Sequence, residues 1–197
     1  MVFHDQKNHI GPMIERLDRE LAYLHFEDSC IHTGPLIRNE GYYSGLTLKE
    51  RRSVFNKLIS FVRQTEIAYK CLYVEKKDID NIIQHSGKLS KVISQFIQQH
   101  YDYFLKFDVV NIYYDNGQTE LTKILSSVFN ALLPNVEFRR VLPKDYKLFQ
   151  VADMLCSLSL VELKIRSDAF SKSEAIFFGS KRDFRKNYLK QIQKKEL

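Results

Sequence analysis

The stretch that decides the fold is DVVNIYYDNGQ, residues 108–118. Residues 108–114 are rich in β-branched and aromatic side chains and give the strongest strand signal in the chain. Asp115-Asn116-Gly117 is a turn sequence, and apolar residues recur at helical spacing over about 118–132. A second strand is predicted over 135–142, NVEFRRVL. A strand, a helix and a second strand in this order are typical of an α/β fold with parallel neighbours.

On both sides of this stretch the chain continues to alternate between helical and extended patterns. A capping box, Thr47 with Glu50, opens a helix that runs to about Gln64. The segment 30–38 contains Gly and Pro and is predicted to be an edge strand or an ordered loop. The remaining predictions are helices over about 8–26, 78–104 (with Asp78 as N-cap) and 147–163, strands over 1–5 and 67–75, a short segment at 173–178 and a last basic helix capped by Ser180. We therefore predict a single α/β domain over residues 1–197 with a partly parallel sheet.

The composition indicates a folded chain and excludes several classes of protein. The 197 residues are about one domain's worth, and 44% of them are hydrophobic, which excludes a disordered chain. No apolar run approaches the roughly 18 residues that a membrane span needs. The first residues lack the charged and apolar regions of a signal peptide. We therefore expect a cytoplasmic protein that does not enter a membrane.

The three cysteines are Cys30, Cys71 and Cys156. Their odd number and the lack of a CxxC pair argue against a disulfide framework or a cysteine-rich zinc site. Each cysteine has apolar neighbours, so the sequence predicts three small, buried, hydrophobic side chains in a reducing compartment.

The positive charge is concentrated near the C-terminus. Residues 1–163 contain 20 Lys/Arg and 20 Asp/Glu, whereas residues 164–197 contain 10 and 4, which is the whole net charge of +6. The last helix carries the basic residues Lys181, Arg182, Arg185, Lys186, Lys190, Lys194 and Lys195. We expect the first five to bind nucleic-acid phosphates, with Phe184 and Tyr188 docking the helix on the core. The alternative is a solvated helix whose basic residues only face water.

Asp115 and Asp153 are the candidate catalytic carboxylates. Asp115 ends a strand, at the sheet edge where α/β proteins bind ligands, and the alternative is an Asp that caps the next helix. Asp153 lies in an otherwise apolar helix, where an unpaired carboxylate costs several kcal/mol. Three partners would compensate it: a helix N-terminus, a Lys or Arg, or a metal ion. The alternative is an Asp stabilised by the dipole of its own helix.

Taken together, the two aspartates supply the oxygen ligands that Mg²⁺ and Mn²⁺ prefer. Two such ions can clamp the attacking and leaving oxygens of a phosphodiester. Such sites usually gather more than two carboxylates, so further ligands are needed. His32 and Glu40 are candidates for this role, although a His without a second ligand at metal spacing is more often structural.

Four segments carry a family resemblance. They are residues 31–38 (IHTGPLIR), 113–118 (YYDNGQ), 149–156 (FQVADMLC) and 177–180 (FFGS), the last followed by the basic run. Together they resemble the bacterial family known as domain of unknown function 3800, over nearly the whole chain. The resemblance implies a ribonuclease-H-like mixed sheet flanked by helices. It also implies a metal-dependent nuclease site with Mg²⁺ or Mn²⁺ and a nucleic-acid substrate, either RNA or DNA.

The resemblance also assigns roles to three residues. Asp115 matches the family's strand-end aspartate, Asp153 the aspartate of its late helix, and His32 a recurrent histidine near the site. Asp115 and Asp153 would then be metal ligands, with His32 as a third catalytic residue.

The chain departs from this family at its N-terminus. Family members open with a strand that ends in an Asp-Glu-Ser-Gly-like motif, and a second strand follows. Val2-Phe3-His4-Asp5 looks like that second strand, so we expect the first central strand and its metal-bridging aspartate to be missing. Three origins fit this pattern: a truncated product, a wrongly chosen start codon or a degenerate homologue. For the first and third we expect weak or no catalysis.

Two functions therefore stay open on the sequence. The first is a metal-dependent nuclease, weakened or inactive through the missing strand. The second is a non-catalytic module that binds nucleic acid or a partner protein through its basic C-terminal helix.

Overall fold

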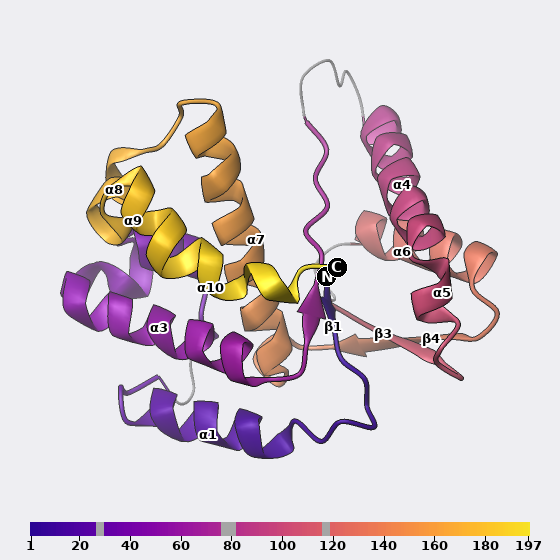
Figure 1. The fold of residues 1–197 in the computed structure, drawn as a ribbon, viewed down its shortest axis with the longest axis horizontal. Helices are drawn as coiled ribbons and strands as arrows, with labels where there is room; N and C mark the ends of the chain where they lie inside the picture. The colour runs from indigo at the N-terminus through magenta and orange to yellow at the C-terminus, as the bar shows by residue number, and fades with distance from the viewer. Residues whose placement is uncertain (27–29, 76–81, 116–118) are drawn as a thin grey trace. The chain divides into compact units, whose positions relative to one another are not determined.

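The computed structural model describes residues 1–26, 30–75, 82–115 and 119–197. The protein is mixed α/β and mostly helical (Figure 1). Its contacts divide the chain into two compact units, which we call unit 1 (Met1–Cys71 with Tyr146–Leu197) and unit 2 (Leu72–Asp145). The single domain expected from the sequence stays a prediction.

Unit 1 contains the helix α7, Lys147–Arg166, whose buried residues lie on one broad face. The predicted capping box is confirmed, because Thr47 and Glu50 hydrogen-bond reciprocally at the start of α3. The other helical elements of unit 1 are α1 (Gly11–Ala22), α2 (Thr33–Arg38), a 3₁₀ helix (Gly41–Gly45), α3 (Leu48–Gln64), α8 (Lys172–Phe178), α9 (Lys181–Phe184), a π-helical turn (Arg185–Leu189), α10 (Lys190–Ile192) and a 3₁₀ turn (Gln193–Lys195).

The two chain ends meet at a short antiparallel pair, where Figure 1 marks N and C side by side. β1 (Val2–Phe3) pairs with β2 (Ala68–Tyr69). The N-terminal ammonium donates to the Lys70 carbonyl at 2.7 Å, and the Leu197 N–H donates to the Tyr69 carbonyl at 3.0 Å. The strand predicted over 67–75 is two residues long in the described part of the chain, where its partners are β1 on one side and Glu196 and Leu197 on the other.

The Gly/Pro segment that the sequence predicts as an edge strand or loop forms the helix α2 instead. Gly34 and Pro35 lie in its first turn, where the missing proline N–H would have no intrahelical partner anyway. At the other end, the buried guanidinium of Arg51 donates to the carbonyls of Leu36 and Ile37 at 2.8 and 3.1 Å. Tertiary contacts thus hold a six-residue helix that would be marginal alone.

Aromatic side chains fill the core of unit 1 where α3, α8 and the C-terminal helices meet. The Phe55 ring makes edge contacts with Phe177, Phe178 and Tyr188 at centroid distances of 5.4, 5.6 and 5.6 Å. Phe184 in turn contacts Phe178 at 5.1 Å. Because all five rings are buried, they fix the C-terminal segment on α3.

Unit 2 contains the β-α-β order that the stretch 108–118 predicts. β3 (Val110–Asp115) and β4 (Val136–Val141) are parallel, and Asp115 lies opposite Val141 in the register. The helix α6, Thr119–Leu132, connects the two strands. The prediction of parallel neighbours is therefore confirmed for this pair.

The long helix predicted over 78–104 is broken at His100. α4 (Ile82–Gln99) ends there and α5 (Tyr101–Phe104) follows, while the predicted N-cap Asp78 lies outside the described residues. The break lets the Phe104 ring contact both Phe96 of α4, at 6.0 Å, and Phe129 of α6, at 6.3 Å.

The strands that the structure describes form two separate two-stranded sheets, β1–β2 and β3–β4. A mixed α/β chain with a parallel pair agrees with the prediction at this level. The ribonuclease-H-like mixed sheet flanked by helices, with its first central strand missing, is not confirmed and stays a prediction.

Candidate functional site

Asp153 lies in the second turn of α7, and its carboxylate points to another helix. Its Oδ2 accepts a hydrogen bond of 2.7 Å from the backbone N–H of Thr33, the first residue of α2. The first N–H groups of a helix have no acceptor within the helix, and the helix dipole is positive at this end. A carboxylate that accepts from such an N–H is therefore stabilised. The sequence predicts a helix N-terminus, a Lys or Arg, or a metal ion as the partner of this carboxylate. For Oδ2 the partner is a helix N-terminus, and it belongs to α2 rather than to α7.

Asp153→Ala should lower the free energy of unfolding by about 1–2 kcal/mol, because it leaves the Thr33 N–H without its acceptor. Asp153→Asn keeps an acceptor oxygen and should recover most of that loss. Urea unfolding of the two variants measures both values. Equal destabilisation by Ala and Asn would contradict the capping role.

His32 is the N-cap residue of α2 and thus a close neighbour of Asp153 in the fold. Its backbone N–H donates to the Tyr43 hydroxyl at 3.0 Å, while its own side chain makes no capping hydrogen bond and is exposed. Burial and, more weakly, the Asp153 carboxylate raise the pKa of the Tyr43 hydroxyl. The structure therefore brings His32 and Asp153 into one neighbourhood of unit 1.

Two further polar residues of α2 and α7 were not singled out as site residues from the sequence. The Thr33 hydroxyl and both amide atoms of Gln150 are buried without a hydrogen-bond partner among the described residues. Buried polar atoms normally have a partner, so these groups are the unusual feature of this neighbourhood. In the sequence, the signal for Gln150 is its position one turn before Asp153 in an otherwise apolar helix.

Asp115 is the last residue of β3, as the sequence predicts, and is partly buried. It belongs to unit 2, whereas Asp153 belongs to unit 1. The meeting of the two aspartates at one catalytic site therefore stays a prediction. The predicted third ligand Glu40 is exposed and pairs with Arg38 at 2.9 Å.

The described residues do not fit a complete Mg²⁺ or Mn²⁺ site. Such ions require several oxygen ligands, and among residues 1–26, 30–75, 82–115 and 119–197 no group of three or more His, Cys, Asp or Glu side chains is placed to hold one. Each unit contributes one predicted aspartate, and the Asp153 carboxylate is already engaged by α2.

The basic C-terminal segment docks on the core as predicted. Phe184, Tyr188 and Ile192 follow at intervals of four residues, and all three are buried. Ser180 caps α9, which begins this segment, by accepting a hydrogen bond from the Asp183 N–H at 3.1 Å. One face of the segment is therefore fixed on unit 1 and the other is free for charged side chains.

The five predicted phosphate-binding residues divide into two groups. Lys181 pairs with Asp168, and Arg185 makes two hydrogen bonds of 3.0 Å to the Glu162 carboxylate. The other three are exposed, and so is a fourth basic residue at the same spacing, which was not among the predicted five. We call these four residues the basic stripe: Arg182, Lys186, Lys190 and Lys194. In the described part of the chain their side chains make no hydrogen bond or ion pair.

Glu162 of α7 accepts the hydrogen bonds of Arg185, which is why Arg185 is not part of the basic stripe. Burial alone would raise the pKa of Glu162, but hydrogen bonds from Arg185 and Arg166 outweigh burial and lower this pKa. A carboxyl whose pKa is lower in the folded state binds fewer protons than in the unfolded state. Its stabilising effect is therefore present above the ordinary pKa of 4.5 and is lost as the pH falls through the lowered value.

Glu162→Gln should lower the melting temperature by roughly 2–4 °C at neutral pH, since Arg185 is half exposed and the ion pair is partly screened by water. The difference from the wild type should shrink as the pH falls below 4.5. Thermal unfolding from neutral to acidic pH measures this trend. Glu15→Gln, an exposed carboxylate of α1, is the control. A difference that does not depend on pH would contradict the stated cause.

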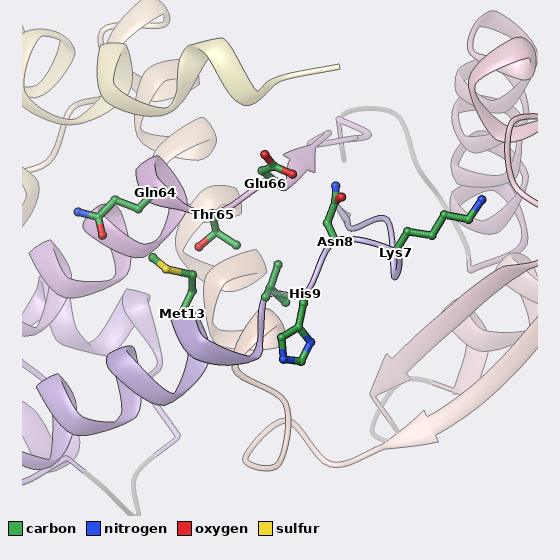
Figure 2. A pocket seen from close by; sticks show the side chains of 8 residues that line it. Lys7, Asn8, His9, Met13, Gln64, Thr65 and Glu66 are labelled. Carbon is green, nitrogen blue, oxygen red and sulfur yellow. The ribbon is translucent and has the colours of Figure 1, made fainter.

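A surface hollow of unit 1 lies between the start of α1 and the end of α3 (Figure 2). It has a volume of about 280 Å³ and is lined by Lys7, Asn8, His9, Ile10, Met13, Gln64, Thr65 and Glu66. Figure 2 shows that the charged side chains of Lys7 and Glu66 do not point toward one another. The Thr65 hydroxyl already donates to the Phe61 carbonyl at 2.7 Å. The hollow thus lacks a group of converging, unpaired polar side chains, and we assign no chemistry to it.

The cysteines differ from their prediction as buried apolar side chains. Cys156 is exposed, and Cys30 and Cys71 are only partly buried. Cys156 lies on α7, where the side chains that face the core occupy other positions of the helix.

Comparison of the sequence with family models, curated proteins and solved structures gives no match. The resemblance to the family of domain of unknown function 3800 therefore stays a prediction.

Proposed function

We propose that this protein binds the phosphate backbone of nucleic acid through the basic stripe. The observation that carries the proposal is the arrangement of the four side chains. They are exposed, follow one another at intervals of four residues and make no hydrogen bond or ion pair with the described residues, on a segment whose other side is buried. Of the two functions that the sequence leaves open, this is the non-catalytic one.

The spacing of the stripe fits a polyanion better than it fits a solvated helix. Like charges four residues apart repel one another and slightly destabilise a helix, and acidic residues commonly offset this. Asp183 is the only acid within residues 181–195, and its carboxylate accepts hydrogen bonds from Ser180 at the start of α9. At about 1.5 Å per residue the stripe is roughly 18 Å long, which corresponds to about five phosphates along one strand of DNA.

A membrane surface fits the stripe less well than nucleic acid does. Helices that lie on anionic membranes bury an apolar face in the lipid. In the C-terminal segment, the apolar side chains Phe184, Tyr188 and Ile192 are already buried in unit 1. In the part of the chain that the structure describes, no helix combines the length and the apolar character that crossing a bilayer requires.

The test is direct binding of fluorescently labelled single-stranded RNA, single-stranded DNA and duplex DNA, followed by anisotropy. We expect retention of at least one of them at about 50 mM salt and weaker binding at about 200 mM. No binding to any of the three, or binding that is indifferent to salt, would overturn the proposal. Vesicles of anionic lipid are the competing probe, and preference for them would also overturn it.

The metal-dependent nuclease implied by the resemblance stays a prediction, and a cleavage assay with the same labelled nucleic acids tests it. Labelled RNA and DNA are incubated with the protein and Mn²⁺, and the products are separated by size. Retention without cleavage supports a non-catalytic binding module. Cleavage that is lost in Asp115→Asn and in Asp153→Asn would favour the nuclease.

A further inference from the structure

Two of the three cysteines lie next to each other in unit 1, although 85 positions separate them in the chain. The sulfur of Cys71 is 3.9 Å from the sulfur of Cys156. Cys71 follows the end of β2, and Cys156 is on α7. Neither residue lies in a CxxC motif, so the sequence contains no local signal for this pair.

The backbone beside Cys71 and the backbone of Cys156 both have hydrogen-bond partners. β2 pairs with β1, and the residue before Cys71 receives the N-terminal ammonium on its carbonyl at 2.7 Å. The Lys70 side chain also pairs with Glu196 at 3.1 Å. On the other side, Cys156 lies in the middle of a twenty-residue helix. The short distance between the sulfurs is therefore set by a helix on one side and by the residue that directly follows a paired backbone segment on the other.

The surroundings of Cys71 favour its reactive form. The hydrogen bond with the Cys156 thiol lowers the pKa of the Cys71 thiol to about 6, although partial burial opposes this, and a hydrogen bond with Ser159 lowers it further. The same contact raises the pKa of Cys156. A thiolate beside a protonated thiol is the arrangement in which one sulfur attacks and the other resolves.

We propose that Cys71 and Cys156 form a reversible disulfide in response to a peroxide. The Cys71 thiolate attacks one oxygen of hydrogen peroxide, so that an S–O bond forms, the O–O bond breaks, and hydroxide leaves and is protonated to water. The Cys156 sulfur then attacks the sulfur of the Cys71 sulfenic acid. An S–S bond forms, the S–O bond breaks, and the leaving hydroxide takes up the Cys156 proton as water. In total two thiols give up two electrons to one peroxide, and two water molecules form.

The disulfide would join the segment that follows β2 to the helix α7 of unit 1. It would close a long loop of the chain, which is the case in which a crosslink restricts the unfolded state most. We therefore expect the oxidised protein to melt roughly 5–10 °C above the reduced one. The inference does not depend on nucleic-acid binding.

The experiment is oxidation of the folded full chain by an equimolar amount of hydrogen peroxide, followed by blocking of the remaining thiols. Intact mass and peptide mapping then identify the product. We expect the loss of two hydrogen atoms and one blocked thiol, with a crosslinked peptide pair containing Cys71 and Cys156. Dithiothreitol should restore all three thiols. Cys30→Ser should still form the crosslink, whereas Cys71→Ser and Cys156→Ser should not.

Three results would overturn the inference. The first is oxidation of Cys71 to sulfinic acid without a crosslink, the second is a crosslink that includes Cys30, and the third is a disulfide between chains instead of within one. Because peptide mapping of the wild-type protein decides among these results, the test does not depend on the folding of any variant.

Discussion

Phe55→Ala should lower the free energy of unfolding of unit 1 by about 3–5 kcal/mol. The Phe55 side chain is fully buried and contacts three other aromatic rings, including Tyr188 of the C-terminal segment. Truncation removes this apolar burial and leaves a cavity that rings held by other helices cannot fill completely. Since Tyr188 docks the segment that carries the basic stripe, the variant should also bind nucleic acid more weakly.

Urea unfolding followed by tryptophan-independent signals, such as far-UV circular dichroism, measures this effect, because the chain contains no Trp. Tyr23→Ala is the matched control, since Tyr23 is 86% exposed at the end of α1 and should change stability by no more than about 0.5 kcal/mol. A loss below about 1 kcal/mol for Phe55→Ala would contradict the central position of this ring in the core.

Replacing the four residues of the basic stripe by Gln should reduce the affinity for nucleic acid on the order of a hundredfold or more at physiological salt. Each side chain that neutralises a phosphate releases a counterion, so the loss accumulates over the stripe. The melting temperature should stay the same or rise slightly, because repulsion between neighbours four residues apart is removed.

A second variant with the same change in net charge is the control. Lys7, Arg19, Lys49 and Arg63 are also exposed in unit 1, and in the described part of the chain their side chains make no hydrogen bond or ion pair. Their replacement by Gln should change the affinity by no more than about threefold, through the long-range field alone. Equal losses in the two variants would mean that net charge, rather than the stripe, determines binding.

The sequence predicts best the elements whose signals are local. The strand 110–115 has a continuous run of β-branched and aromatic residues, and the helix α3 begins at a capping box, so both lie where the pattern indicates. The helix α2 was missed because its stability comes from distant residues. Asp153 supplies the acceptor at its first N–H, and Arg51 supplies the donor at its last carbonyls.

The sequence predicts the region of the candidate interface and three of the four residues of the basic stripe. The concentration of charge at residues 164–197 and the docking role of Phe184 are visible in the sequence. The pairing of Arg185 with Glu162 spans 23 positions, and the pairing of Lys181 with Asp168 spans 13, so neither follows from helical spacing. The fold distinguishes these two paired residues from the four that make no ion pair with the described residues.

The most direct test of nucleic-acid binding through the basic stripe is the slope of log K against log salt concentration for a labelled single strand, measured for the wild type and for both Gln variants. We predict a wild-type slope of roughly −3, from about 0.7 per phosphate contact and four contacts. The control variant should keep this slope, and the stripe variant should approach zero. A stripe variant with the wild-type slope would contradict the proposal, since its four side chains would then contact no phosphate.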